Sequence, residues 1–82
     1  MNRDLVESVV KRHIADSVDG VSESTIDIQK SLKDYGASSL DIVSVVSGAM
    51  RELKVKIPRS ELKNIDSIDG LIDMFVVNGS RG

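Results

Sequence analysis

Two adjacent serines, Ser38 and Ser39, are the side chains best placed to carry chemistry in this 82-residue sequence. They follow a turn residue, Gly36, and precede a long apolar run in the stretch KDYGASSLDIVSVV. A serine at the start of a helix lies beside unpaired backbone N–H groups and a partial positive charge, both of which favour a phosphate. The same position suits a plain N-cap, which needs only one hydroxyl. From these residues alone the N-cap is the simpler interpretation, and a phosphate-bearing serine is the alternative.

A catalytic centre is hard to assemble from the other side chains. A serine nucleophile needs a base, and the only histidine, His13, lies in a different segment with no second imidazole or cysteine near it. Ser60 and Lys63 have Ser-x-x-Lys spacing, but the companion motifs are missing. The carboxylates are scattered singly, without a metal-binding or acid–base pattern. We therefore expect neither an enzyme nor a metal site, and we expect His13 to be a half-exposed helix residue.

Composition and charge narrow the class of protein further. The chain has no cysteine, which leaves out disulfides, zinc–thiolate sites and thiol nucleophiles and fits a reducing cytoplasm. The N-terminal segment is charged and amphipathic, and no run approaches about 18 apolar residues, so we expect no signal peptide and no membrane contact. The net charge is −2. A basic patch at residues 51–63 has no aromatic side chain that could stack a base, so we expect no nucleic-acid binding.

Apolar periodicity predicts three main helices. The first covers about residues 3–17 with Asn2 as its N-cap, the second covers residues 39–53, and the third begins at Asp66 or Ser67. Their apolar stripes consist of Val6, Val9, Val10 and Ile14, of Ile42, Val45, Val46, Ala49 and Leu53, and of Ile68, Leu71, Ile72 and Phe75. The second segment is rich in β-branched residues, but its length and its period of about 3.6 favour a helix over a strand.

The connections complete an all-α fold, a small four-helix bundle of three main helices plus one short helix. Residues 18–38 show no sustained period, so we expect a long loop between the first two helices, held to the core by Ile26, Ile28 and Leu32 and containing a short helical turn around residues 31–35. A loop of this length in so small a domain is often functional. Pro58 can begin the short fourth helix. We expect residues 1–77 to form the domain and residues 78–82 a flexible tail.

Gly48 falls inside the second predicted helix, where glycine costs about 0.8–1 kcal/mol relative to alanine. Close approach of a neighbouring helix would explain the glycine. Space for a group inserted into the bundle is the alternative explanation. We favour the close approach.

The segment SLKDYGASSLDIVSVV, followed by KIP ending at Pro58, resembles the acyl carrier proteins, the phosphopantetheine-binding domains of fatty acid and polyketide synthesis. The signature of that family has a leucine, a glycine and a small residue before Asp-Ser-Leu, which opens the second helix. The resemblance covers about residues 6–75 and includes the first stripe, the long loop and the break at Ile57-Pro58. With this resemblance, a phosphate-bearing serine becomes the preferred interpretation over a plain N-cap.

The resemblance implies a carrier rather than an enzyme. The modified serine of the family falls on Ser39, which would bear a covalent 4′-phosphopantetheine whose thiol holds an acyl group as a thioester. The implied partners are a phosphopantetheinyl transferase and an acyltransferase, ketosynthase or related synthase enzyme. We expect a monomeric, cytoplasmic protein.

Two departures from the family pattern bear on the site. Ser38 stands where the family has an aspartate, so a second hydroxyl is present and Ser38 is the alternative attachment point. The second helix of the family is acidic, whereas here it contains only two carboxylates. We therefore expect partner docking to depend more on apolar contacts, and the predicted docking residues are Leu40, Asp41, Val43 and Ser47.

The sequence leaves open which group the carrier holds, which pathway it serves, and whether it is a discrete protein or an excised domain. The segment IPRSELKNIDSIDGLIDMF is similar to free-standing carriers of polyketide β-branching cassettes, and a length near 80 with Met1 in place fits a discrete protein better than an excised domain. Two functions are alternatives to an acyl carrier. One is a peptidyl carrier that bears aminoacyl groups in nonribosomal peptide synthesis, and the other is a small helical interaction domain in which Ser39 is only a cap.

Overall fold

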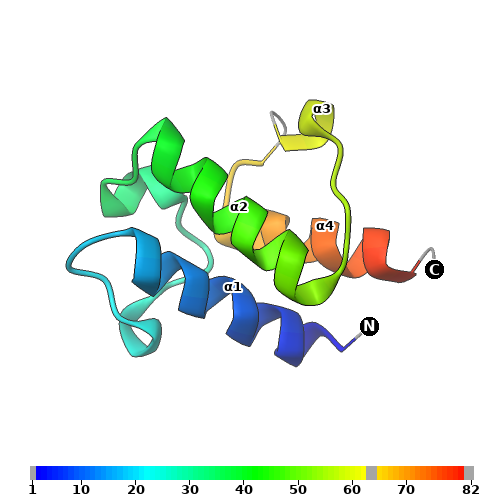
Figure 1. Cartoon of the computed structure of the whole chain (residues 1–82). Coiled ribbons are helices and arrows are strands. Elements are labelled where there is room, and N and C mark those ends of the chain that lie inside the picture. The colour runs from blue at the N-terminus through cyan, green and yellow to red at the C-terminus, as the bar shows by residue number, and fades with distance from the viewer. Residues whose placement is uncertain (1, 63–64, 81–82) are drawn as a thin grey trace.

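The computed structural model describes residues 2–62 and 65–80, and all regular structure in these residues is helical. The elements are, in chain order, α1 (Arg3–Ser17), the 3₁₀ turns η1 (Glu23–Thr25) and η2 (Leu32–Tyr35), α2 (Ser39–Leu53), α3 (Arg59–Leu62) and α4 (Ile68–Ser80). Figure 1 shows α1, α2 and α4 packed together, with α3 on the connection between α2 and α4. The predicted all-α bundle of three main helices and one short helix is confirmed. Within the described ranges no helix is long and apolar enough to span a bilayer.

The core is built from the predicted stripes. The buried side chains of the three long helices are Val6, Val9, Val10 and Ile14 of α1, Val45, Val46 and Ala49 of α2, and Ile68, Leu71, Ile72 and Phe75 of α4. Ile42 and Leu53 lie near the two ends of the α2 stripe and are only partly buried against this core. The period of about 3.6 therefore identified the buried face of each helix correctly.

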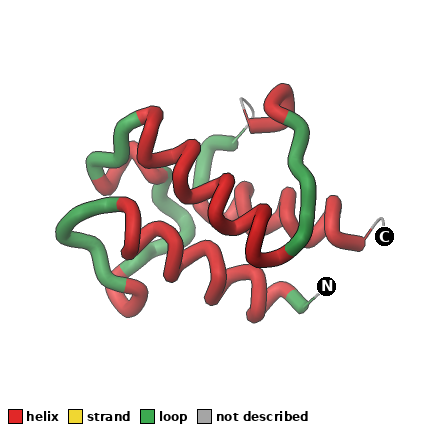
Figure 2. The backbone as a smooth tube through the Cα atoms, viewed as in Figure 1, coloured by secondary structure: helices red, strands yellow, loops and turns green. Residues whose placement is uncertain are grey.

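Figure 2 shows the long connection between α1 and α2, most of it drawn as green loop. Apolar side chains and backbone hydrogen bonds hold this loop to the bundle. Ile26 and Leu32 are buried and Ile28 is partly buried against the core, as predicted. The backbone N–H of Ile68 donates to the Lys30 carbonyl at 2.9 Å, and that of Asp69 donates to the Ile28 carbonyl at 2.8 Å. These bonds satisfy two N–H groups of the first turn of α4, which have no acceptor inside the helix. The loop therefore has a fixed path, and it positions the start of α2.

The predicted N-caps are present in α1 and α4. The side chain of Asn2 accepts a hydrogen bond from the Asp4 N–H at 2.8 Å, and Ser67 Oγ accepts one from the Gly70 N–H at 3.1 Å. Of the two residues proposed to begin the last helix, Ser67 is thus the one whose side chain caps it.

Helix α4 continues past residue 77, where the sequence suggested a tail. The Asn78 side-chain amide donates to the Met74 carbonyl at 2.8 Å and to the Glu61 carboxylate at 3.4 Å. Asn78 and Gly79 are therefore helical, and the side chain of Asn78 connects this last turn to α3. Residues 81–82 of the expected tail lie outside the described residues.

Helices α1 and α2 approach each other closely at Gly48. A Cβ atom at this position would lie 2.6 Å from Nδ1 of His13, so no larger residue fits without a shift of the imidazole. The ring is held by a contact of 2.9 Å between its Nε2 and Glu52, which also pairs with Arg12. The preferred explanation of Gly48 is confirmed, and His13 is a partly buried packing residue rather than a free imidazole.

Arg3 connects α1 to α4 through ion pairs with Asp69 and Asp73. The hydrogen bond to Asp73, helped by the charges of both carboxylates, raises the pKa of the Arg3 guanidinium above its ordinary value.

Candidate functional site

Gly36 turns the chain into α2. It ends η2 in the left-handed region with φ +82°, and its N–H donates to the Lys33 carbonyl at 3.0 Å. Residues with a side chain are disfavoured in this conformation, so glycine is needed here. The turn presents the two serines at the beginning of α2.

Ser38 is the N-cap of α2. Its Oγ accepts a hydrogen bond from the Asp41 N–H at 3.2 Å, and the Asp41 carboxylate accepts one from the Ser38 N–H at 3.0 Å. This reciprocal arrangement is a capping box, and an N-cap of this kind contributes about 1 kcal/mol. The Ser38 hydroxyl therefore has a structural role.

Ser39 is the first residue of α2 and is exposed. Its hydroxyl has no hydrogen-bond partner among the described residues. The first backbone bond of the helix runs from the Ile42 N–H to the Ser38 carbonyl at 3.0 Å, so the N–H groups of Ser39 and Leu40 have no acceptor within the helix. A free hydroxyl beside unpaired donors at the positive end of a helix fits an ester to a phosphate.

The predicted docking residues lie around this position. Leu40 is 80% exposed and Val43 is 51% exposed, so two large apolar side chains lie about one turn apart on the outer surface of α2. Ser47 lies one turn beyond Val43 on the same face and is partly buried. The fourth predicted residue, Asp41, is partly buried, and its carboxylate is engaged in the capping box. The structure thus places Leu40, Val43 and Ser47 along one outer face.

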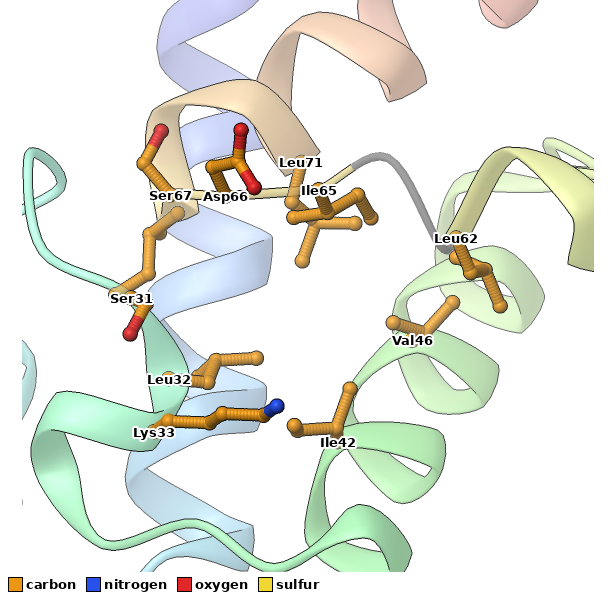
Figure 3. Close-up of a pocket in the computed structure, with 11 residues that line it drawn as sticks. Ser31, Leu32, Lys33, Ile42, Val46, Leu62, Ile65, Asp66, Ser67 and Leu71 are labelled. Carbon is orange, nitrogen blue, oxygen red and sulfur yellow. The ribbon is translucent and has the colours of Figure 1, made fainter.

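A cavity of about 350 Å³ opens beside the first turns of α2. Its apolar lining consists of Leu32, Ile42, Val46, Leu62, Ile65, Ile68 and Leu71, and Ser31, Lys33, Asp66 and Ser67 add polar atoms. Figure 3 shows Leu32 and Lys33 facing Ile42 across it. Ile42 follows Ser39 by three residues, which is about 5 Å along the helix axis. Sequence periodicity did not predict this cavity, because its lining comes from four separate segments.

The other chemical candidates gain no support. His13 lies at the contact between α1 and α2, in contact with Glu52. Among the residues that the structure describes, no group of three or more His, Cys, Asp or Glu side chains could hold a metal ion. Lys63 of the Ser-x-x-Lys spacing lies outside the described residues.

The family model for the phosphopantetheine attachment site matches residues 10–75, which is most of the chain. The chain belongs to this family. The resemblance inferred from the sequence is thereby confirmed at the level of the family. Members carry a covalent 4′-phosphopantetheine, so this protein is a phosphopantetheine-bearing carrier. No solved structure matches the chain significantly.

Carriers of this family are typically non-catalytic and work with phosphopantetheinyl transferases and synthase enzymes. The departure at Ser38 has a simple physical account in such a carrier. Serine and aspartate are comparably good N-caps, so serine preserves the start of α2 while removing one negative charge beside Ser39.

Proposed function

We propose that this carrier holds acyl intermediates as thioesters on a 4′-phosphopantetheine arm joined to Ser39. It presents them to enzymes of polyketide or fatty acid biosynthesis. The observation that carries the proposal is the difference between the two serines. The capping box engages the Ser38 hydroxyl, while the Ser39 hydroxyl is exposed and without a partner. When bound, the group supplies the thiol that this cysteine-free chain lacks.

The electrostatics of α2 favour Ser39 as the anchor. A phosphodiester at the first helical residue would lie beside the unpaired N–H groups of Ser39 and Leu40. Negative charge at a helix N-terminus is stabilised by about 0.3–1 kcal/mol. A bulky ester on Ser38 would instead disturb the bond from the Asp41 N–H.

The cavity supports an acyl cargo over an aminoacyl cargo. Its apolar lining suits a hydrocarbon chain, for which burial contributes about 0.8 kcal/mol per methylene. An aminoacyl group would bring an ammonium, whose transfer from water into the apolar part of this lining is costly, since the carboxylate that the lining contains, that of Asp66, is exposed to solvent. The cavity wall formed by Ile42 lies one helical turn from Ser39, so an arm that folds back along the protein can bring the chain to the cavity.

Leu40 and Val43 are the centre of the proposed docking face. Both are exposed apolar side chains close to the anchor, and Ser47 extends their line along α2. A partner that covers them buries apolar surface while it receives the arm, which favours binding in the productive orientation. Asp41 lies at the edge of the face, where its carboxylate is already hydrogen-bonded.

Loading with coenzyme A and a broad-specificity phosphopantetheinyl transferase tests this function. Intact mass is measured for the wild type, Ser39→Ala and Ser38→Asp, because aspartate keeps the cap but removes the second hydroxyl. We expect the wild type and Ser38→Asp to gain one phosphopantetheine and Ser39→Ala to gain none. An unmodified wild type would refute the proposal, and a loaded Ser39→Ala would refute the choice of serine.

A further inference from the structure

The C-terminal end of α2 and the segment after it form a basic surface. It consists of Arg51, Lys54 and Lys56, all exposed, and we call it the basic end of α2. Residues 42–58 contain a single carboxylate, that of Glu52. Glu52 is bound to Arg12 and His13 of α1 and so does not compensate this charge.

The cations of this surface differ in their pairing from those of α1. In α1, Arg3, Lys11 and Arg12 each form an ion pair with a carboxylate. At the basic end of α2 no cation pairs with a carboxylate in the part of the chain that the structure describes. Three neighbouring positive charges without counter-charges attract an acidic partner.

The surface of the basic end is shallowly hollowed. An open depression is lined by Met50, Arg51, Lys54, Val55 and Lys56. Val55 is buried and Met50 is partly buried, whereas the three cations are exposed. A glutamate or aspartate side chain fits such a depression, because its methylene groups contact apolar atoms while its carboxylate accepts charge-assisted hydrogen bonds.

Helix stability alone does not account for these residues. A cation in the last turn, such as Arg51, is favoured by the helix dipole. Lys56 lies beyond the helix, in the segment before α3. Lys54 adopts φ +56°, a left-handed conformation in which glycine is preferred, so the positive side chain is present against the local backbone preference.

The basic end continues the docking face. Counted from Leu40, the positions Val43, Ser47 and Arg51 follow at offsets of 3, 7 and 11, which lie on one helical face, and Lys54 is the C-cap at the end of that helix. Arg51 is twelve residues from Ser39, or about 18 Å along the axis. A partner that binds lengthwise on α2 therefore meets apolar side chains near the arm and positive charge at the far end.

We propose that the basic end of α2 is a second docking point, which receives acidic side chains of the enzyme that takes up the cargo. The proposal rests on the proposed function, since it uses the face beside Ser39. It predicts a partner with carboxylates about 18 Å from the entrance for the arm. The positive charge of this docking point is opposite in sign to that of the acidic second helix that the family resemblance implies.

Titration of the ¹⁵N-labelled full-length protein with a capped hexaglutamate peptide, followed by NMR, tests the proposal. We expect saturable shift changes at the amides of residues 50–56, and none there with hexalysine. Arg51→Glu should weaken binding about fivefold or more, because it replaces attraction by repulsion at the site. Lys33→Glu changes the net charge equally but lies on η2, and should leave the affinity unchanged.

Three results would overturn the proposal. They are the absence of saturable shifts at residues 50–56, an equal loss of affinity in Lys33→Glu, and tighter binding of a thymidine hexanucleotide than of hexaglutamate at residues 50–56. End-point loading of wild type and Arg51→Glu with phosphopantetheine is measured in parallel. Loading without peptide binding contradicts the second docking point alone, whereas peptide binding without loading contradicts the proposed function alone.

Discussion

Ser38 and Asp41 exchange two hydrogen bonds at the start of α2, one from each backbone N–H to the side chain of the other residue, at 3.0 and 3.2 Å. This exchange separates two neighbouring side chains of identical chemistry. Ser38 is the N-cap, whereas Ser39 is the first helical residue and projects an unbonded hydroxyl into solvent. Helix register, rather than the intrinsic reactivity of the hydroxyls, distinguishes the two serines.

Loss of the cap should destabilise the carrier. We expect Ser38→Ala to lower the free energy of unfolding by about 1 kcal/mol, because the Asp41 N–H loses its acceptor. Ser38→Asp should stay within about 0.5 kcal/mol of the wild type. Urea unfolding followed by circular dichroism measures both. Equal stability of all three proteins would contradict a capping role for Ser38.

Gly48 and His13 should be energetically coupled. Gly48→Ala gains helix propensity but forces the imidazole to move, and we expect a net destabilisation of about 1 kcal/mol. In a His13→Ala background the same change should be neutral or stabilising, since the obstacle is gone. A double-mutant cycle by urea unfolding gives the coupling. Additive effects would show that the two side chains do not interfere.

Lys54→Gly should stabilise the fold, although it shortens a side chain. The residue has φ +56°, and glycine adopts that conformation without the strain of a Cβ, so we expect a gain of about 0.5–1 kcal/mol. Lys56→Gly is the matched control, because Lys56 has no positive φ and should gain nothing. A loss of stability in Lys54→Gly would show that the lysine side chain supports the fold through packing.

An acyl chain attached to the arm should enter the cavity and stabilise the carrier. We expect octanoyl loading to raise the Tm above that of the phosphopantetheine form, since buried methylenes contribute about 0.8 kcal/mol each. Ile42→Phe would fill the cavity and remove this increase. Val43→Phe changes the exposed side of the same helix and should retain it. Equal increases in both variants would place the chain outside the cavity.

Local sequence patterns were sufficient for most of the fold. Apolar periodicity gave the bounds of α1 and α2, because the buried face of each helix repeats with the helical period. The caps at Asn2 and Ser67 were also predictable, since capping depends on neighbouring residues only. The turn η1 was missed, because residues 23–25 bury no side chain and carry no apolar signal.

Features that depend on tertiary contacts were harder to predict from the sequence. Gly48 suggested a close approach, but only the packed helices identify His13 as the neighbour. The proposal that Ser39 is the attachment residue comes from the family resemblance. The role of Ser38 as the N-cap of α2 is visible only in the geometry of the capping box. The depression at Arg51 forms because the chain after α2 brings Val55 and Lys56 beside Met50.

The most direct test of the account is to locate the modification after transferase loading. Fragmentation mass spectrometry of the intact, loaded wild type can separate cleavage between Ala37 and Ser38 from cleavage between Ser38 and Ser39. We predict that every fragment containing Ser39 carries phosphopantetheine and that fragments ending at Ser38 carry none. Phosphopantetheine on fragments ending at Ser38 would contradict the central claim.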